Sequence, residues 1–279
     1  MSTIVVIGSK GMLGTELMSF LSQGKNRVIG LGRSDIDISR ATCVDLLIKL
    51  NPKIILNCAA YTNVDKAETE RELCYATNVT GVKHIVEACR RTNCRLIHLS
   101  TDYVFDGTKK EYREDDAKNP LNYYGITKAQ GEDIILSSLD DFIIFRTSWL
   151  FGKHGKNFVR TILRLSQEKS MLKVVNDQIG SPTYAQDLAA FICTHLDLPS
   201  SIYHVTNQGT CSWYDFARDI FKITGITTPL YPCTTKEYPL PARRPSHSVL
   251  KNTKLPLLRP YQDALKDYLR EGNYGNTKN

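Results

Sequence analysis

The sequence predicts an α/β protein in which a doubly wound parallel sheet is followed by a smaller C-terminal lobe. Three observations support this prediction. Short apolar runs alternate with helical stretches through the first 150 residues, and a glycine-rich turn follows the first apolar run. Nine of the 11 prolines lie beyond residue 180, where the alternation becomes irregular.

The strands are expected at the apolar runs, because strands that are buried on both faces read as continuous apolar segments. These runs are 3–7, 28–31, 53–57, 95–100 and 141–146, with a further one at 201–205. Helices are expected between them, where apolar residues recur at helical spacing: 12–22, 44–50, 70–91, 123–136 and 185–196. This repeated β-α order is typical of a Rossmann-type fold, in which ligands bind at the carboxyl ends of the strands.

Three glycines, Gly8, Gly11 and Gly14, follow the first strand and open the first helix. Such glycines allow a tight turn and let backbone N–H groups approach a pyrophosphate at the helix N-terminus. The spacing is G-x-x-G-x-x-G, and its place between a strand and a helix predicts dinucleotide binding. We therefore expect residues 1–150 to form an NAD(P)-binding Rossmann domain, to which 171–205 return. Residues 151–170 and 206–279 are expected to form a substrate-binding lobe.

Arg33 is the first charged residue after the second strand. An acidic residue there would bind a ribose 2′-hydroxyl, whereas an arginine can pair with a 2′-phosphate. Arg33 therefore favours NADPH over NADH, although NADH stays open and Arg33 can also be read as a solvated loop residue.

Tyr124 and Lys128 are four residues apart on a predicted helix, so both side chains project from one face. The lysine ammonium is expected to lower the pKa of the phenol toward neutrality. Thr101 stands in a hydroxyl-rich turn at the end of the fourth strand and can hydrogen-bond a carbonyl oxygen. Together these groups would polarise a ketone for attack by hydride.

Several other classes of function are disfavoured. The net charge of +7 comes from dispersed basic residues without interleaved aromatics, which argues against nucleic acid as a partner. No apolar run is long enough for membrane insertion, and the N-terminus lacks the basic region of a secretory signal, so we expect a cytoplasmic protein. The 8 cysteines and 6 histidines lack zinc or disulfide spacing, so no metal site is predicted.

Five longer sequence segments indicate a particular enzyme family. They are NCAAYTNVDKAE at 57–68, STDYVFDG at 100–107, PLNYYGITK at 120–128, RTSWLF at 146–151 and DQIGSPT at 177–183. With the glycine turn, they resemble the extended short-chain dehydrogenase/reductases, and within these the dTDP-4-dehydrorhamnose reductase family. The resemblance implies NAD(P)H-dependent reduction of the C4 ketone of dTDP-4-dehydro-L-rhamnose to dTDP-L-rhamnose. This nucleotide sugar serves surface polysaccharides such as O-antigen.

The resemblance also implies roles for individual residues. The catalytic group would be Thr101, Tyr124 and Lys128, with Tyr124 donating a proton to the C4 oxygen and Lys128 holding the nicotinamide ribose. The cofactor would contact Gly8, Gly11, Met12, Leu13, Gly14, Arg33, Asp37, Ile38, Ala59, Ala60, Tyr61, Asn78 and Ser100, besides Tyr124 and Lys128. The sugar nucleotide would contact Asp102, Tyr103, Val104, Phe105 and Trp149.

Two positions depart from the family pattern, both in the expected substrate lobe. His247 stands where the family's R-P-x-N-S-x-L string has asparagine, and Tyr261 stands where the closing helix has tryptophan. Some members bind Mg²⁺ through glutamates at a dimer contact, and the resemblance allows a homodimer, but the sequence identifies no such metal site. Two alternatives stay open. One is a reductase or epimerase of another 4-keto-6-deoxy nucleotide sugar. The other is a non-catalytic subunit similar to the regulatory β-subunit of methionine adenosyltransferase.

Overall fold

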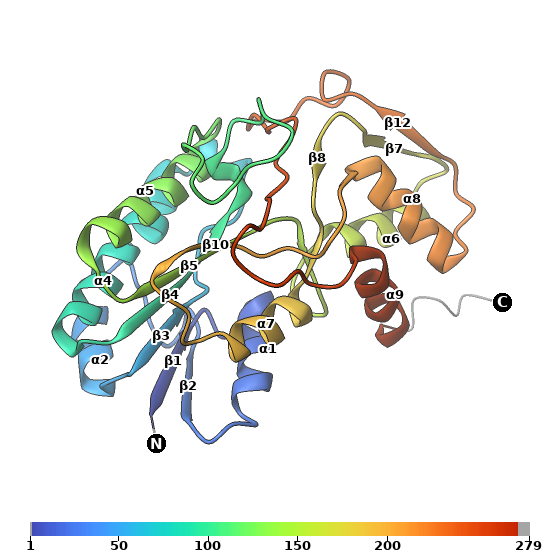
Figure 1. The fold of residues 1–279 in the computed structure, drawn as a ribbon. Coiled ribbons are helices and arrows are strands. Elements are labelled where there is room, and N and C mark those ends of the chain that lie inside the picture. Colours follow the sequence, from blue (N-terminus) through green and yellow to red (C-terminus); the bar gives the residue numbers. More distant parts are fainter. Residues whose placement is uncertain (1, 273–279) are drawn as a thin grey trace.

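The structure is a computed structural model that describes residues 2–272. Its main sheet has six strands in the order β10-β5-β4-β3-β1-β2, all parallel (Figure 1). The strands are β1 Thr3–Ile7, β2 Arg27–Leu31, β3 Ile54–Asn57, β4 Arg95–Thr101, β5 Phe142–Thr147 and β10 Ser201–His204. The chain reverses its direction across the sheet between β1 and β3, and that switch point is where open α/β sheets bind ligands. The predicted fold class is confirmed.

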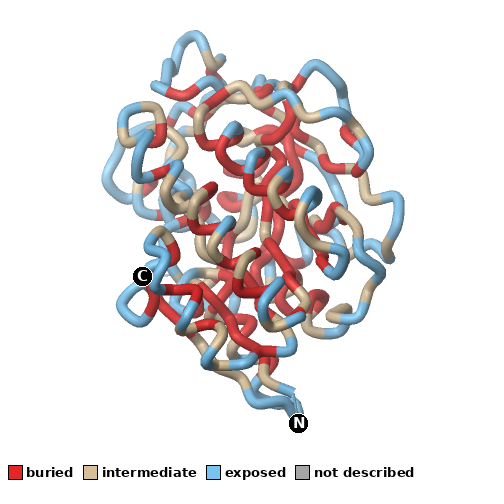
Figure 2. The backbone as a smooth tube through the Cα atoms, turned by 90° about the vertical axis from the view of Figure 1, so that its left-hand side faces the viewer, coloured by how far each residue is buried: buried red, intermediate tan, exposed pale blue. Residues whose placement is uncertain are grey.

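Helices cover both faces of this sheet, as the alternation of side chains in β1 illustrates. Val5 and Ile7 pack into a core with the helices on one face, whereas Ile4 and Val6 pack with those on the other. The first face carries α2 (Thr42–Leu50) and α4 (Gly81–Thr92), and the second carries α1 (Met12–Leu21) and α7 (Ala185–Thr194). Burial on both faces explains the continuous apolar runs. In Figure 2 the buried backbone lies mostly in the interior, and the exposed backbone lies mainly at the outside of the molecule.

The helix predicted at 70–91 is interrupted. It consists of α3 (Arg71–Tyr75), a π-helical turn at Ala76–Thr80 and then α4. Such π-helical turns are frequent at functional sites. The predicted helix at 123–136 is α5 (Tyr123–Ser138), which packs beside α4.

The C-terminal lobe has its own core, centred on Phe151, Phe216 and Tyr268. Its helices are α6 (Phe158–Glu168), α8 (Trp213–Thr224) and α9 (Tyr261–Glu271). Two short sheets complete it, pairing β7 (Leu172–Val175) with β12 (Leu230–Cys233) and β8 (Ile179–Gly180) with β11 (Cys211–Ser212). Two further short strands, β6 (Leu150–Phe151) and β9 (Thr183–Tyr184), pair with each other.

This pairing corrects one expectation. Residues 172–180 stay in the lobe, because β7 and β8 pair with lobe strands, and the return to the main sheet begins only with α7 and ends in β10. Residues 273–279 of the expected lobe lie outside the described residues. No helix within residues 2–272 has the length and apolar character needed to cross a membrane.

Candidate active site

A cavity of about 620 Å³ lies at the carboxyl ends of the central strands. Gly8 follows β1, Cys58 follows β3, Thr101 ends β4 and Thr147 ends β5, and all four residues line it. Trp213 reaches the same cavity from the lobe. The cavity therefore lies where the sheet topology predicts a ligand, with the lobe closing one side.

The glycine turn forms one end of this cavity. Gly8 has a left-handed φ of 80°, and a Cβ added at Gly14 would lie 2.1 Å from the carbonyl oxygen of Gly8. Gly11 is the N-cap of α1 and provides no side-chain cap, so side chains do not compete for the first N–H groups of the helix. Together with Met12 and Leu13, which also line the cavity, this turn has the shape and polarity to hold a pyrophosphate.

The close approach at Gly14 gives a first testable prediction. Replacing Gly14 by alanine forces the backbone of the turn apart, because the contact is with a carbonyl oxygen and not with a flexible side chain. We expect Gly14→Ala to lower the free energy of unfolding by about 1–3 kcal/mol and to weaken NADPH binding in a fluorescence titration. Gly24→Ala is the matched control, since its Cβ would come no closer than 3.4 Å to another atom. Equal behaviour of the two variants would contradict the prediction.

The segment after β2 lies outside the cavity lining. Arg33 and Asp37 are exposed, and Asp37 accepts hydrogen bonds from the backbone and hydroxyl of Ser39. The side chain of Ile38 is buried in the core, so only its backbone can face a ligand. The contacts of these residues with an adenosine moiety stay a prediction.

Asn78 is a positioning residue for the segment after β3. Its side chain accepts a hydrogen bond from the Tyr61 N–H at 2.8 Å and donates to the Tyr61 carbonyl at 3.1 Å. It also donates to the Thr127 hydroxyl on α5 at 3.1 Å. Ala60 lines the cavity between these anchors, whereas Ala59, Tyr61 and Asn78 do not. The π-helical turn thus carries a buried amide that fixes the cofactor-side wall.

Thr101, Tyr124 and Lys128 all line the cavity. Thr101 is the last residue of β4, and its hydroxyl accepts from the Tyr103 N–H at 3.2 Å and donates to Asp102 Oδ1 at 3.0 Å. Tyr124 and Lys128 are one turn apart on α5, with only 9% and 2% of their surfaces exposed. The sequence prediction that these three side chains share one site agrees with this geometry.

The start of α5 explains why this helix approaches the Thr101 turn so closely. Asn122 caps the helix by accepting from the Gly125 N–H at 2.8 Å. A Cβ at Gly125 would lie 2.2 Å from the Tyr103 carbonyl oxygen, so only glycine allows this packing. Cap and glycine together bring Tyr124 to the end of β4.

The electrostatics of Tyr124 differ from the expectation. Burial raises the pKa of Tyr124 above its ordinary range, with the Thr101 hydrogen bond acting in the opposite direction. The predicted lowering of this pKa by Lys128 is therefore wrong for the protein without a ligand. A raised pKa keeps the phenol protonated at neutral pH, which suits a proton donor in a reduction. Burial lowers the pKa of Lys128 to about 8, while Glu132 acts to raise it.

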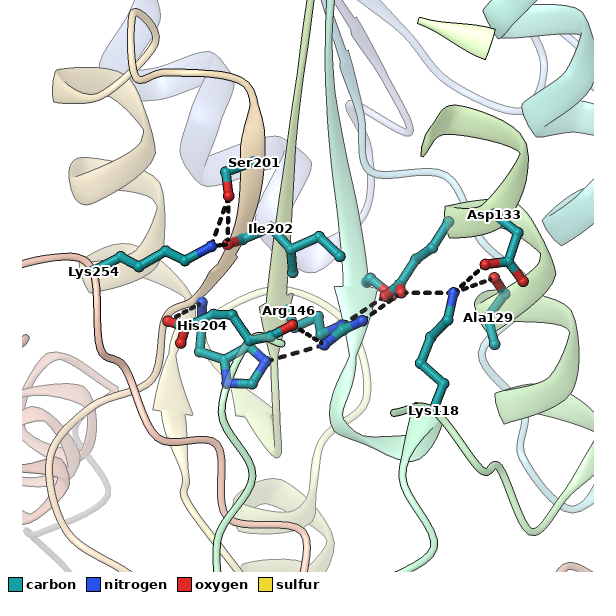
Figure 3. Close-up of polar contacts among 11 residues, drawn as sticks. Lys118, Ala129, Asp133, Arg146, Ser201, Ile202, His204 and Lys254 are labelled. Carbon is teal, nitrogen blue, oxygen red and sulfur yellow. Dashed lines mark hydrogen bonds and ion pairs between the residues drawn. The ribbon is translucent and has the colours of Figure 1, made fainter. Parts of the chain in front are cut away.

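A buried ion pair holds the middle of α5 against the sheet. The side chains of Arg146 and Glu132 are 1% and 0% exposed and form two hydrogen bonds of 2.9 and 2.7 Å. Figure 3 shows Arg146 between the helix that carries Ala129 and Asp133 and the strand that carries His204. The Ser100 hydroxyl donates to Glu132 at 2.5 Å. Ser100, expected at the cofactor, thus also anchors α5 to the sheet.

Not all of the predicted substrate contacts reach the cavity. Asp102, Tyr103 and Trp149 line it, but Val104 and Phe105 are fully buried, and Phe105 stacks on Tyr112 away from it. The side chains of Val104 and Phe105 are buried, so only their backbone can face a ligand, and their contacts with the sugar nucleotide stay a prediction. Burial also raises the pKa of Asp102 to about 6.

The sequence interpretation missed ten lining residues, which are Cys58, Thr62, Val64, Leu99, Thr147, Ser148, Leu150, Gly155, Lys156 and Trp213. Trp213 stacks on Trp149 with ring centroids 3.5 Å apart and an interplanar angle of 6°. Its one sequence signal is its position at the start of a helix, directly after the capping residue Ser212.

The two departures from the family pattern lie away from the cavity. Tyr261 is buried in the lobe core and donates its hydroxyl proton to Asp219 at 2.7 Å. His247 forms a backbone bridge with Ile179 and does not line the cavity. Among residues 2–272, no group of three or more histidine, cysteine, aspartate or glutamate side chains is arranged to hold a metal ion.

Comparison with known proteins identifies the family of the chain. Residues 1–273 match the family described as RmlD substrate binding domain. The spore coat polysaccharide biosynthesis protein SpsK of Bacillus subtilis is 40% identical over 277 residues, covering 97% of this chain and 98% of that protein. A dTDP-4-dehydrorhamnose reductase of Aggregatibacter actinomycetemcomitans is 41% identical over 271 residues, covering 91% of this chain and 92% of that enzyme.

The fold matches as closely as the sequence. The crystal structure of dTDP-4-dehydrorhamnose reductase from Bacillus anthracis in complex with NADP superimposes with a TM-score of 0.93. It shares 35% sequence identity and covers 97% of this chain and 99% of that one. The chain therefore belongs to the RmlD substrate binding domain family, the family of the dTDP-4-dehydrorhamnose reductases.

Proposed function

We propose that this protein reduces the C4 ketone of dTDP-4-dehydro-L-rhamnose to dTDP-L-rhamnose, with NADPH as the preferred reductant and NADH as a second one. The observation that carries the proposal is the meeting of Tyr124, Thr101 and Lys128 in a cavity whose far end is the glycine turn. Family membership and the NADP-bound relative support the same reaction. The product would serve the synthesis of a surface polysaccharide.

The cofactor fits the residues that are present. The space that a Cβ of Gly14 would fill, and the uncapped N–H groups of α1, suit a pyrophosphate. Arg33 is exposed after β2, where it can pair with a 2′-phosphate. When bound, the dihydronicotinamide supplies the hydride.

In the proposed reaction, the chain's own residues handle the proton. The ketone oxygen lies against the Tyr124 and Thr101 hydroxyls and is polarised by both. As the oxygen gains negative charge, the Tyr124 O–H bond breaks and the proton moves to it, because an alkoxide is a far stronger base than a phenolate. Lys128 holds the nicotinamide ribose. Burial of Tyr124 keeps water from competing for the proton.

The lobe would select the sugar nucleotide. The stacked rings of Trp149 and Trp213 offer a flat apolar wall on the lobe side of the cavity. We propose that residues 1–150, together with the returning segment 185–205, form the cofactor-binding domain, and that residues 151–184 and 206–272 form the lobe, which binds the dTDP sugar together with Trp149. The proposal includes a cytoplasmic enzyme and allows a homodimer.

The deciding experiment follows NADPH absorbance in the presence of dTDP-4-dehydro-L-rhamnose generated in situ. We expect rapid oxidation with the dTDP sugar, slower oxidation with NADH and none with a GDP-linked ketosugar. Oxidation only with another 4-keto-6-deoxy nucleotide sugar would show that this other sugar is the substrate. Tight NADPH binding without any oxidation, combined with altered kinetics of an added partner enzyme, would favour the regulatory-subunit alternative and overturn the proposal.

A further inference from the structure

A buried chain of polar groups runs from Lys128 away from the cavity. Lys128 Nζ lies 3.1 Å from His98 Nε2 and donates to the Leu99 carbonyl oxygen at 2.6 Å. His98 Nδ1 lies 3.0 Å from Asn57 Nδ2, and Asn57 Oδ1 accepts the Ala59 N–H at 3.1 Å. Both His98 and Asn57 are 1% exposed, so solvent does not supply alternative partners. The proposed mechanism makes no use of this pair.

The Ala59 N–H determines which groups of this hydrogen-bond network donate and which accept. A backbone N–H can only donate, so the amide oxygen of Asn57 must face it and the NH₂ group must face His98. His98 Nδ1 is then the acceptor, and the proton of the neutral ring lies on Nε2. Burial, together with the charge of Lys128, holds the pKa of His98 well below its ordinary range, so the ring stays neutral.

The Nε2–H group of this tautomer faces Lys128. A neutral amine has a lone pair that accepts such a hydrogen bond, whereas an ammonium has only donors. The network therefore stabilises the neutral amine, which can accept the Nε2–H. It destabilises the ammonium, because an N–H donor of Lys128 would then face the N–H donor of His98. This agrees with the lowered pKa of Lys128, for which burial is the largest cause.

Other ionisable groups around Lys128 do not reverse this preference. Glu132 on α5 favours the ammonium, but both of its oxygens are bonded to Arg146. Burial raises the pKa of Cys58, after β3, to about 12, and burial also raises the pKa of Cys74 on α3. Both thiols are therefore neutral at physiological pH. Tyr124, on the same helix, becomes anionic only when it has given up its proton.

We infer that His98 and Asn57 are positioning residues that stabilise the neutral amine of Lys128, which accepts the His98 Nε2–H, and that they thereby set the pH above which turnover falls. The inference rests on the proposed function for its kinetic consequence only.

The sharpest test is Asn57→Asp, which is nearly isosteric. One carboxylate oxygen can still accept the Ala59 N–H, while the other accepts from His98 and draws its proton to Nδ1. Nε2 then becomes an acceptor for the ammonium. In ¹⁵N NMR spectra of ¹⁵N-histidine-labelled protein, we expect Nε2–H in the wild type and Nδ1–H in the variant. The imidazole signal that disappears in His98→Gln is the signal of His98. Nδ1–H in the wild type would overturn the inference.

The pH profile of kcat supplies the second readout. Turnover of the wild type should fall above about pH 8, where the ammonium is lost. Asn57→Asp should shift this alkaline limb of the pH profile to higher pH by roughly one unit, equal to a tenfold change in the ionisation constant of Lys128. The double variant Asn57→Asp/His98→Phe keeps the added charge without the imidazole, and its limb should lie below that of Asn57→Asp. Coincident limbs in the two variants would reject the role of His98.

The two arms separate this inference from the proposed function. The tautomer is measured without substrate, so an Nε2–H signal in a protein that is inactive toward the dTDP sugar rejects the proposed function alone. Turnover with an Nδ1–H signal rejects the inference alone. If Asn57→Asp does not fold, His98→Gln takes its place, because a glutamine can turn its amide oxygen toward the ammonium and should also move the limb upward. An unmoved limb in that variant would contradict the inference.

Discussion

Replacing Tyr124 by phenylalanine should lower kcat by a factor of about 10²–10⁴, the usual contribution of a positioned general acid. The ring should keep its place, because it is buried and packs edge-on against Tyr103 with centroids 5.9 Å apart. Only the hydroxyl, which lines the cavity with Thr101, is lost. We therefore expect folding and NADPH affinity to persist, as measured by denaturant unfolding and by fluorescence titration, while steady-state turnover collapses.

The neighbouring tyrosine offers a matched control. Tyr123 is partly exposed, does not line the cavity, and carries the Arg71 guanidinium 4.8 Å above its ring. Tyr123→Phe removes the same hydroxyl from the same helical turn and should leave kcat within about twofold of the wild type. Wild-type turnover in Tyr124→Phe would show that the proton comes from another group.

Replacing Arg146 by methionine should lower the free energy of unfolding by about 3–5 kcal/mol. The change leaves the Glu132 carboxylate, which is 0% exposed, without its main charged partner in the protein interior. This loss is a large share of the roughly 5–15 kcal/mol that stabilises an ordinary domain. Urea unfolding measures it, and the same variant should lose turnover because Glu132 anchors α5 through Ser100.

An exposed pair on α6 serves as the control. Arg164 and Glu168 are four residues apart, with 59% and 48% of their side chains exposed, so Arg164→Met should change stability by no more than about 0.5 kcal/mol. The double variant Arg146→Met/Glu132→Leu should recover much of the stability lost in Arg146→Met, because it removes the unpaired charge. An unfolding midpoint of Arg146→Met equal to that of the wild type would refute the role of this pair.

The sequence was most informative where its signal was local. The strands of the main sheet were predictable because burial on both faces leaves uninterrupted apolar runs. Tyr124 and Lys128 were recognisable because one helical turn separates them. Trp213 and Lys156 were missed, since they reach the cavity from distant parts of the chain and no local pattern records that approach. Likewise, a contiguous motif does not reveal that Tyr103 faces the cavity while Phe105 faces the core.

The late arrival of β10 has a consequence for synthesis on the ribosome. β5 ends at Thr147, but its neighbour at the sheet edge is completed only at His204, after part of the lobe has been made. At about 5–20 residues per second, the nascent chain holds β5 as an open edge for roughly 3–11 s. An unpaired edge invites pairing with other chains, so stalling or truncation between these residues should yield aggregates rather than a stable half-protein. Synthesis of the segment between β5 and β10 is therefore the stage at which we most expect aggregation.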